Sequence, residues 1–264
     1  MPTSPLASAA TALQCDDVTE APWAKLVPED QWEILITGID AIERAGINVL
    51  LGGALALATY TGHWRNTKDV DVLVHEGDRG RARDELQKAG FDDYYERQAY
   101  DRSWIFRGFK DGVIFDIISG LPNHRVEIDD QWFRRAHCIT LHGRRFFVAP
   151  AEELVRMKLY VMQRERCDWV DVLNVLACTV GTLDWTWLIQ RMGRDLALLQ
   201  SVLALFNWMS AGRAREIPSW VRHRFALPEV EAEDLAAMEE RRSRLLDSRP
   251  WFAPHQPSDQ PLQL

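Results

Sequence analysis

An aspartate interrupts an otherwise apolar run of this chain, and that interruption constrains the fold more than any other feature. The run, Val113–Ile118, reads VIFDII, and its apolar residues are typical of a buried strand. A carboxylate in the middle of such a strand is strongly unfavourable unless another group pairs with it or binds it. Asp116 therefore predicts a functional site that is built on a sheet.

Two further aspartates alternate with valines earlier in the chain. Successive strand side chains point to opposite faces, so Asp69 and Asp71 share one face while Val70 and Val72 take the other. Two adjacent carboxylates repel each other, and hard oxygen ligands suit a divalent cation such as Mg²⁺ or Mn²⁺. If the two strands are neighbours, Asp116 completes a cluster for two metal ions roughly 3.5–4 Å apart. The three aspartates are the predicted metal-binding and catalytic residues.

A glycine pair, Gly52 and Gly53, precedes the aspartates at an expected strand-to-helix junction. Backbone N–H groups at such a turn approach a phosphate closely, and the helix N-terminus favours its charge. Arg65 and Lys68 are suitable counter-charges for phosphate. Because glycine pairs also occur in ordinary turns, the phosphate role depends on their combination with the aspartates.

The character of the chain changes near Pro150, from mixed strands and helices to helices alone. We therefore expect an α/β (α+β) domain over 28–150 and a helical region over 151–249. Residues 1–27 predict a flexible leader, and residues 250–264, rich in Pro, Gln and Ser, predict a disordered tail. The expected strands are 47–51, 69–74, 94–98, 103–109 and 113–118, with 138–141 and 146–148 as loops or strands. The expected helices are 28–46, 54–60, 78–89, 151–164, 169–178, 185–192, 196–209 and 229–246.

The glycine pair, the run RNTKDVD at 65–71 and the later Asp116 resemble the nucleotidyltransferase superfamily, whose fold is that of DNA polymerase beta. The likeness covers roughly residues 47–175. It is greatest to small bacterial members, namely antibiotic nucleotidyltransferases and the toxins of abortive-infection toxin–antitoxin systems. The resemblance implies a mixed sheet with flanking helices. It also implies that the first two aspartates bind metal, and that the third binds metal or activates the acceptor hydroxyl.

The resemblance adds further residues to the candidate site. It implies nucleotide-binding roles for Thr67, within the run at 65–71, and for Lys158, and it extends to the segment 164–171, where relatives often carry an Arg…Asp…Asp helix. Many members have Gly-Ser where this chain has Gly52-Gly53, which removes one hydroxyl contact to phosphate. Lys158 also fits a packed helix face, and the aspartates of 164–171 also fit structural ion pairs.

These features predict a metal-dependent enzyme that moves a nucleoside monophosphate from ATP or another NTP to a hydroxyl acceptor. A small cationic acceptor, such as an antibiotic, fits the formal net charge of -8, because cations favour acidic clefts. An RNA or protein acceptor would need a basic patch. The candidates for that patch are Arg191, Arg194, Arg213, Arg215, Arg222 and Arg224.

Two alternatives keep the same fold. One is a non-catalytic module that binds a nucleotide or a partner, and the other is a toxin with an antitoxin partner. The clustered acids count against the first alternative, because they repel one another without a cation. Motifs of zinc enzymes, serine hydrolases and P-loop kinases are absent from the sequence.

The chain carries no sign of membrane insertion or export. Its first basic residue is Lys25, and its longest largely apolar stretch, 47–58, is interrupted by glycines and too short to span a bilayer. The four cysteines are scattered without a C-x-x-C pair. We therefore expect a cytoplasmic protein with reduced cysteines.

Overall fold

The computed structural model describes residues 20–229 and 235–246. The chain divides into two compact units, Met1–Pro150 and Ala151–Leu264. The first 19 residues of the expected leader, the expected tail and residues 230–234 of the last expected helix lie outside the described residues.

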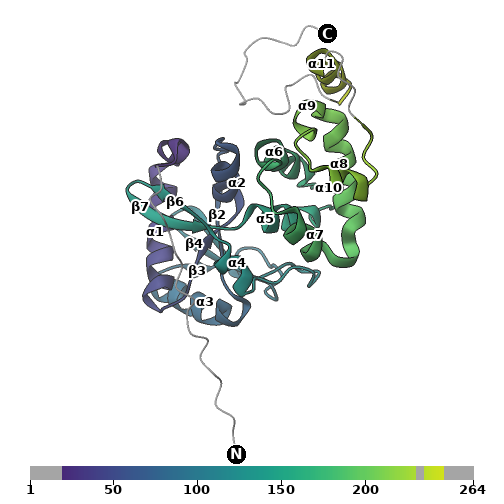
Figure 1. Ribbon diagram of the computed structural model, residues 1–264. Helices are drawn as coiled ribbons and strands as arrows, with labels where there is room; N and C mark the ends of the chain where they lie inside the picture. Colours follow the sequence, from purple (N-terminus) through teal and green to yellow (C-terminus); the bar gives the residue numbers. More distant parts are fainter. Residues whose placement is uncertain (1–19, 230–234, 247–264) are drawn as a thin grey trace, which may run out of the picture. The chain divides into compact units, whose positions relative to one another are not determined.

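A mixed sheet of seven strands forms the centre of the first unit (Figure 1). Its strand order is β3-β4-β5-β2-β1-β7-β6. The central neighbours β2 and β5 run parallel, whereas β4 and β5 form an antiparallel hairpin. The strands are β1 Leu50–Leu51, β2 Asp69–Leu73, β3 Asp92–Asp93, β4 Ile105–Lys110, β5 Val113–Ile118, β6 His137–Leu141 and β7 Arg144–Val148.

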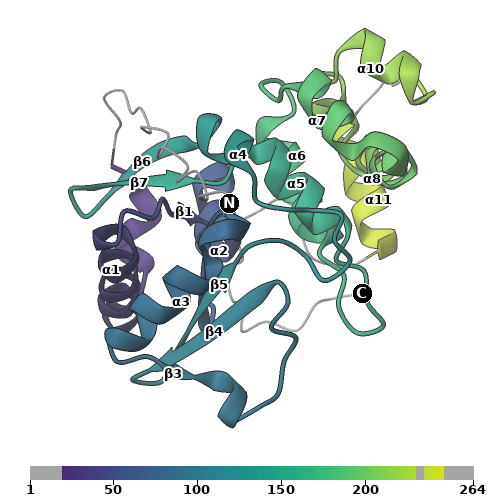
Figure 2. The same ribbon diagram turned by 90° about the horizontal axis from the view of Figure 1, so that it is seen from below.

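Helices flank this sheet, which confirms the predicted fold class. Helices α1 and α3 pack against each other and against the β4–β5 side of the sheet (Figure 2). This packing is close, because a Cβ atom on Gly38 of α1 would come within 2.3 Å of the Phe115 ring of β5. The helices of this unit are α1 Glu29–Arg44, α2 Gly53–Thr61, α3 Arg79–Lys88 and α4 Asp130–Arg134.

Part of the expected flexible leader is folded. Residues Pro22–Leu26 form the 3-10 helix η1, and Trp23 within it is only 3% exposed. The ring of Trp23 stacks on Trp64 with the centroids 6.0 Å apart. The two residues are some forty positions apart in the sequence, so local periodicity cannot predict their contact.

Two local expectations in the first unit are wrong. The expected strand 94–98 does not form. Residues Tyr94–Glu96 are the 3-10 helix η3 and a turn follows, because the Asp93 carboxylate accepts a hydrogen bond from the Tyr95 N–H at 2.9 Å and turns the chain. The short helix α4 was not expected. Its start is fixed by Asp129, whose carboxylate accepts a hydrogen bond from the Gln131 N–H. The segments left as loops or strands are the antiparallel pair β6 and β7.

The second unit is helical. Helix α5 ends at Leu159, earlier than expected, because the chain turns back so that the Gln163 N–H donates to the Arg166 carbonyl at 2.7 Å. No helix within 20–229 or 235–246 is long and apolar enough to cross a membrane. The helices of this unit are α5 Ala151–Leu159, α6 Trp169–Thr179, α7 Trp185–Met192, α8 Leu196–Met209, α9 Ala211–Ala214, α10 Ser219–Arg224 and α11 Leu235–Leu246.

The cysteines differ in their chemical state. Cys138 of β6 is disulfide-bonded, whereas Cys167 and Cys178 are free and exposed. The expectation of reduced cysteines is therefore wrong for Cys138.

Candidate active site

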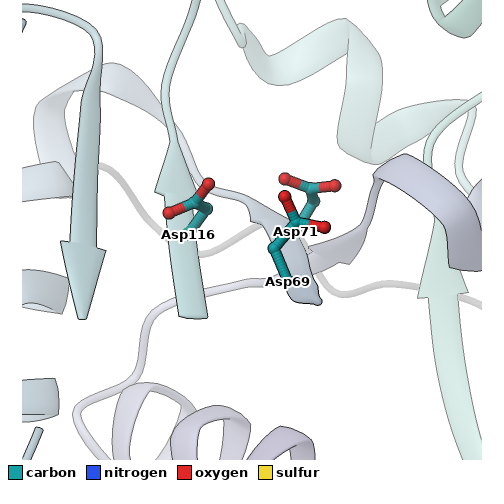
Figure 3. Close-up of side chains that lie close together, drawn as sticks. All are labelled: Asp69, Asp71 and Asp116. Atoms are coloured by element: carbon teal, nitrogen blue, oxygen red, sulfur yellow. The ribbon is translucent and has the colours of Figure 1, made fainter. Parts of the chain in front are cut away.

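Three carboxylates meet on neighbouring strands at the centre of the first unit. Asp71 of β2 lies directly opposite Asp116 of β5 in the parallel register. Asp69 lies two residues before Asp71, on the same face of β2. One carboxylate oxygen from each of the three lies within 4.8 Å of the others, and Figure 3 shows their carboxyl groups gathered over the two strands. The structure thus brings together the three aspartates that the sequence singled out.

The apolar residues of both strands explain why these aspartates share a face. Val70 and Val72 are 5% and 0% exposed, so burial of the valines fixes which way β2 faces. Phe115 and Ile117 are fully buried and fix β5 in the same way. The alternate positions, Asp69 and Asp71 of β2 and Asp116 of β5, therefore lie on the opposite face of the sheet.

An arginine that the sequence analysis did not consider holds the most buried carboxylate. Arg107 of β4 lies opposite Asp116 in the hairpin register. Its Nε donates to the two carboxylate oxygens at 3.0 and 3.1 Å, and its Nη2 donates to Oδ2 at 2.8 Å. This two-pronged geometry is the strong form of an arginine–carboxylate pair. The sequence could have indicated this pair. A hairpin turn at Asp111-Gly112 places residue 107 opposite residue 116.

Burial nevertheless dominates the titration of Asp116, which is only 1% exposed. Desolvation raises the pKa of Asp116 to about 6, against the lowering effect of Arg107 and with a further increase from the charge of Asp69. The same hydrogen bond raises the pKa of Arg107, against its own desolvation. The two increases in pKa are consistent. Attraction between the pair favours both charged forms, but for Asp116 the loss of solvation outweighs this attraction.

The glycine pair lies directly against Asp71. The Gly52 N–H donates to the Asp71 carbonyl at 2.9 Å, so this N–H belongs to the sheet. Gly53 begins α2 with φ of 45°, a conformation that side chains with a Cβ rarely adopt. A Cβ atom on Gly53 would lie 1.8 Å from Oδ2 of Asp71. Glycine at position 53 is therefore required by the place of the Asp71 carboxylate, and any phosphate contact falls to N–H groups from Gly53 onward.

A chain of hydrogen bonds ties Asp69 to α1. Gln31 of α1 donates from Nε2 to the carbonyl of Thr67, and the Thr67 hydroxyl donates to Oδ1 of Asp69. Gln31 is 8% exposed. Thr67, which is predicted to contact nucleotide, thus binds Asp69 of the aspartate cluster. Its contact with nucleotide stays a prediction. Gln31 was missed because it lies 36 residues before Thr67.

The remaining predicted residues lie in two places. Arg65 and Lys68 are exposed on the segment that leads into β2. Lys158 belongs to the second unit, where it is 7% exposed and its Nζ donates to Asp168 at 2.8 Å and Asp171 at 2.7 Å. Burial raises the pKa of Asp168, but the hydrogen bond from Arg166 and the charge of Lys158 outweigh it and hold that pKa below its ordinary value. A contact of Lys158 with nucleotide also stays a prediction.

Comparison with known proteins identifies a family. The model of a family described as "uncharacterised nucleotidyltransferase" matches residues 34–209, which include all three aspartates. No curated protein matches the chain.

Several solved structures are similar at low identity. The solution structure of the antibiotic-resistance factor ANT(2'')-Ia has 16% identity and a TM-score of 0.39, over 75% of this chain and 97% of that chain. The lincomycin-bound lincosamide adenylyltransferase LnuA has 14% identity and a TM-score of 0.40, over 56% of this chain and 96% of its own. An antigenic nucleotidyltransferase-like protein from Paracoccidioides brasiliensis has 13% identity and a TM-score of 0.44, over 80% of this chain and 99% of its own.

Proposed function

The chain belongs to this nucleotidyltransferase family, and we propose that it moves a nucleoside monophosphate from an NTP to a hydroxyl group in a reaction that requires a divalent cation. The observation that carries the proposal is the cluster of Asp69, Asp71 and Asp116, with ligand oxygens within 4.8 Å of one another. Hard carboxylate oxygens at this spacing fit Mg²⁺ or Mn²⁺.

The three aspartates have different environments and hence different proposed roles. Asp69 and Asp71 are half-buried, and their proposed role is to hold a cation that in turn binds the phosphate oxygens. Asp116 is held by Arg107 through both oxygens, which fixes its orientation and leaves it lone pairs for an acceptor proton or a cation. A bound divalent cation would supply charge neutralisation at the phosphates and orientation of the attacking oxygen.

The phosphates would lie between the first turn of α2 and the exposed cations that precede β2. The N–H groups of Gly53 and the next residues favour negative charge at that helix end. Lys68 and Arg65 are exposed and precede Asp69 closely in the sequence. Their proposed role is to neutralise the triphosphate as pyrophosphate leaves.

We propose a small cationic acceptor in preference to RNA. RNA would require a basic patch, and two of the arginines that were candidates for this patch already bind groups of the protein. Arg191 pairs with the buried Glu153 at 2.5 Å, and Arg222 donates to Asn207 and the Ala214 carbonyl, both at 3.0 Å. The formal net charge of -8 also disfavours a polyanion.

The first experiment is a melting measurement with each NTP, with and without Mg²⁺. A ligand at about one hundred times its Kd stabilises the native state by about 2.7 kcal/mol. We expect a metal-dependent increase in Tm for one or more NTPs in the wild type and none in Asp69→Asn/Asp71→Asn. The matched control is Asp92→Asn, which removes an exposed carboxylate elsewhere on the same unit and should leave the increase unchanged.

Turnover then distinguishes the acceptors and the alternatives. With an α-labelled NTP, the label should move to a cationic hydroxylated small molecule, such as an aminoglycoside, and Asp71→Asn should abolish the transfer. Label on RNA or on a partner protein would overturn the small-molecule proposal but keep the transferase. Nucleotide binding without transfer to any of these acceptors would instead favour a non-catalytic module, and no metal-dependent binding at all would refute the proposed site.

A further inference from the structure

We propose that the first unit carries a second anion site, separate from the aspartate cluster, for a phosphate group that is free or belongs to a small phosphomonoester. The site is a cavity of about 180 Å³ beside the first turns of α3 and the start of β4. Arg79, Arg83 and Arg102 line it, together with the apolar side chains of Ile105 and Phe106. Neither the sequence analysis nor the proposed transfer reaction uses these arginines.

Two of the arginines come from one face of α3. Arg79 and Arg83 are four residues apart, a spacing at which like charges destabilise a helix unless an anion lies between them. Arg79 donates from Nη1 to the Ser103 carbonyl and to the Ser119 hydroxyl, the latter at 3.0 Å. Its other donors have no hydrogen-bond partner in the described part of the chain. The Arg79 guanidinium is therefore anchored at one nitrogen and has donors left for a ligand.

The third arginine comes from the segment before β4. The guanidinium of Arg102 lies 3.9 Å from the ring centroid of Tyr95, and its Nη2 donates to Asp93 at 2.6 Å. These contacts hold the side chain beside the cavity although it is half exposed. A guanidinium that is already held in place loses less entropy when it binds an anion.

Two acids also line the cavity, and they do not cancel the arginines. The Asp93 carboxylate already accepts from Arg102, from the Tyr100 hydroxyl at 3.0 Å and from the Tyr95 N–H at 2.9 Å. Glu76 is exposed. The lining residues themselves carry three positive groups and two negative ones, and Asp84, which pairs with Arg83 at 2.7 Å, is not part of the lining.

The size and walls of the cavity limit the ligand. A volume of about 180 Å³ is below the roughly 300 Å³ of a pocket for a drug-sized molecule. A Cβ atom on Gly80 would meet nothing within 4 Å, so space remains next to the first turn of α3. Guanidinium groups match phosphate oxygens in pairs. Phosphate on a small molecule fits these conditions, whereas the two acids disfavour a nucleic-acid backbone.

The test is calorimetric titration with phenyl phosphate and with inorganic phosphate, in EDTA at constant ionic strength. Wild type, Arg83→Gln and Arg79→Gln are compared with Lys88→Gln, which removes an exposed charge from the other end of α3. We expect saturable one-site binding that each arginine variant weakens about tenfold, as the loss of a charged hydrogen bond implies. Lys88→Gln should bind as the wild type does. Tighter binding of phenyl phosphate identifies a monoester as the ligand, and equal binding identifies free phosphate.

Three results would overturn the proposal. The first is the absence of saturable binding, and the second is an equal loss in Lys88→Gln, which would mean a general charge effect. The third is tighter binding in Asp71→Asn, because without metal the loss of a carboxylate charge would strengthen phosphate binding only at the aspartate cluster. Arg83→Gln is the decisive variant, because within residues 20–229 and 235–246 Arg83 makes only an exposed pair with Asp84, and its removal leaves the anchoring bonds of Arg79 intact. A short RNA that binds more tightly than either phosphate would also refute the assignment.

Discussion

Substitution of Gly53 by alanine should disable the site through Asp71, without removing any functional group. The new Cβ atom would lie 1.8 Å from Oδ2 of Asp71, whereas ordinary contact begins at 3.4 Å. The carboxylate must therefore move by more than 1 Å, a displacement of the size that costs about 100-fold in rate when it affects a catalytic group. We expect Gly53→Ala to lose transfer activity and the metal-dependent increase in Tm.

The glycine that follows the other end of α2 provides a matched control for this prediction. Gly62, just after α2, has φ of 71°, and a Cβ atom there would meet nothing within 4 Å. Both alanine variants bear about 1–2 kcal/mol of left-handed backbone strain. Only Gly53→Ala adds the clash, worth about 1–3 kcal/mol. Because about 1 kcal/mol shifts Tm by roughly 2–4 °C at this size, Gly53→Ala should melt several degrees below Gly62→Ala.

The assay is melting and labelled-NTP transfer, each over a range of Mn²⁺ concentrations. If Gly53→Ala keeps the same metal response and rate as Gly62→Ala, then Asp71 is free to move without consequence, and its assignment as a ligand is refuted. Gly53→Ser should behave like Gly53→Ala because the obstacle is the Cβ atom.

Three further predictions concern Asp116, Thr67 and Lys158. Burial raises the pKa of Asp116 to about 6, so the folded state keeps a proton that the unfolded state releases above its ordinary value. Without metal, stability should therefore fall by up to about 3 kcal/mol as pH rises through that window; urea unfolding should show this slope in wild type but not in Asp116→Asn. Thr67→Val should weaken Mn²⁺ binding by releasing Asp69, with kcat falling more than the KM for NTP rises. Lys158→Met should cost about 3–5 kcal/mol because it removes a buried cation that pairs with both Asp168 and Asp171, and unchanged NTP affinity in the folded variant would refute its nucleotide role.

The aspartate cluster could be predicted because its signal lies in short stretches of sequence. Alternation in β2 and the apolar run of β5 each fix a face, and only their adjacency had to be assumed. The parallel pairing of Asp71 with Asp116 supplies that adjacency. All eight expected helices overlap helices of the structure for the same reason, because helical periodicity is local. The short helices α4, α9 and α10 were not expected.

The supporting residues could not be predicted in the same way. Gln31 acts on Asp69 through Thr67, and the stacking of Trp23 on Trp64 likewise joins distant parts of the chain. Such contacts depend on tertiary packing and leave no period in the sequence. Arg107 is the intermediate case: its hairpin partner follows from the turn at 111–112, but only once the register of β4 and β5 is known.

Arg107 also limits how many cations the cluster can hold. Three carboxylates and one guanidinium carry a formal charge of two negatives, which a single divalent cation neutralises. A second cation at the bare protein would leave excess positive charge beside the buried Asp116 in the middle of β5, where solvent screens it poorly. The phosphates of an NTP would bring the negative charge that a second cation needs. The two-ion arrangement expected from the sequence should therefore exist only with nucleotide bound. A titration that counted two tight Mn²⁺ ions without nucleotide would show that Arg107 leaves Asp116 when metal binds.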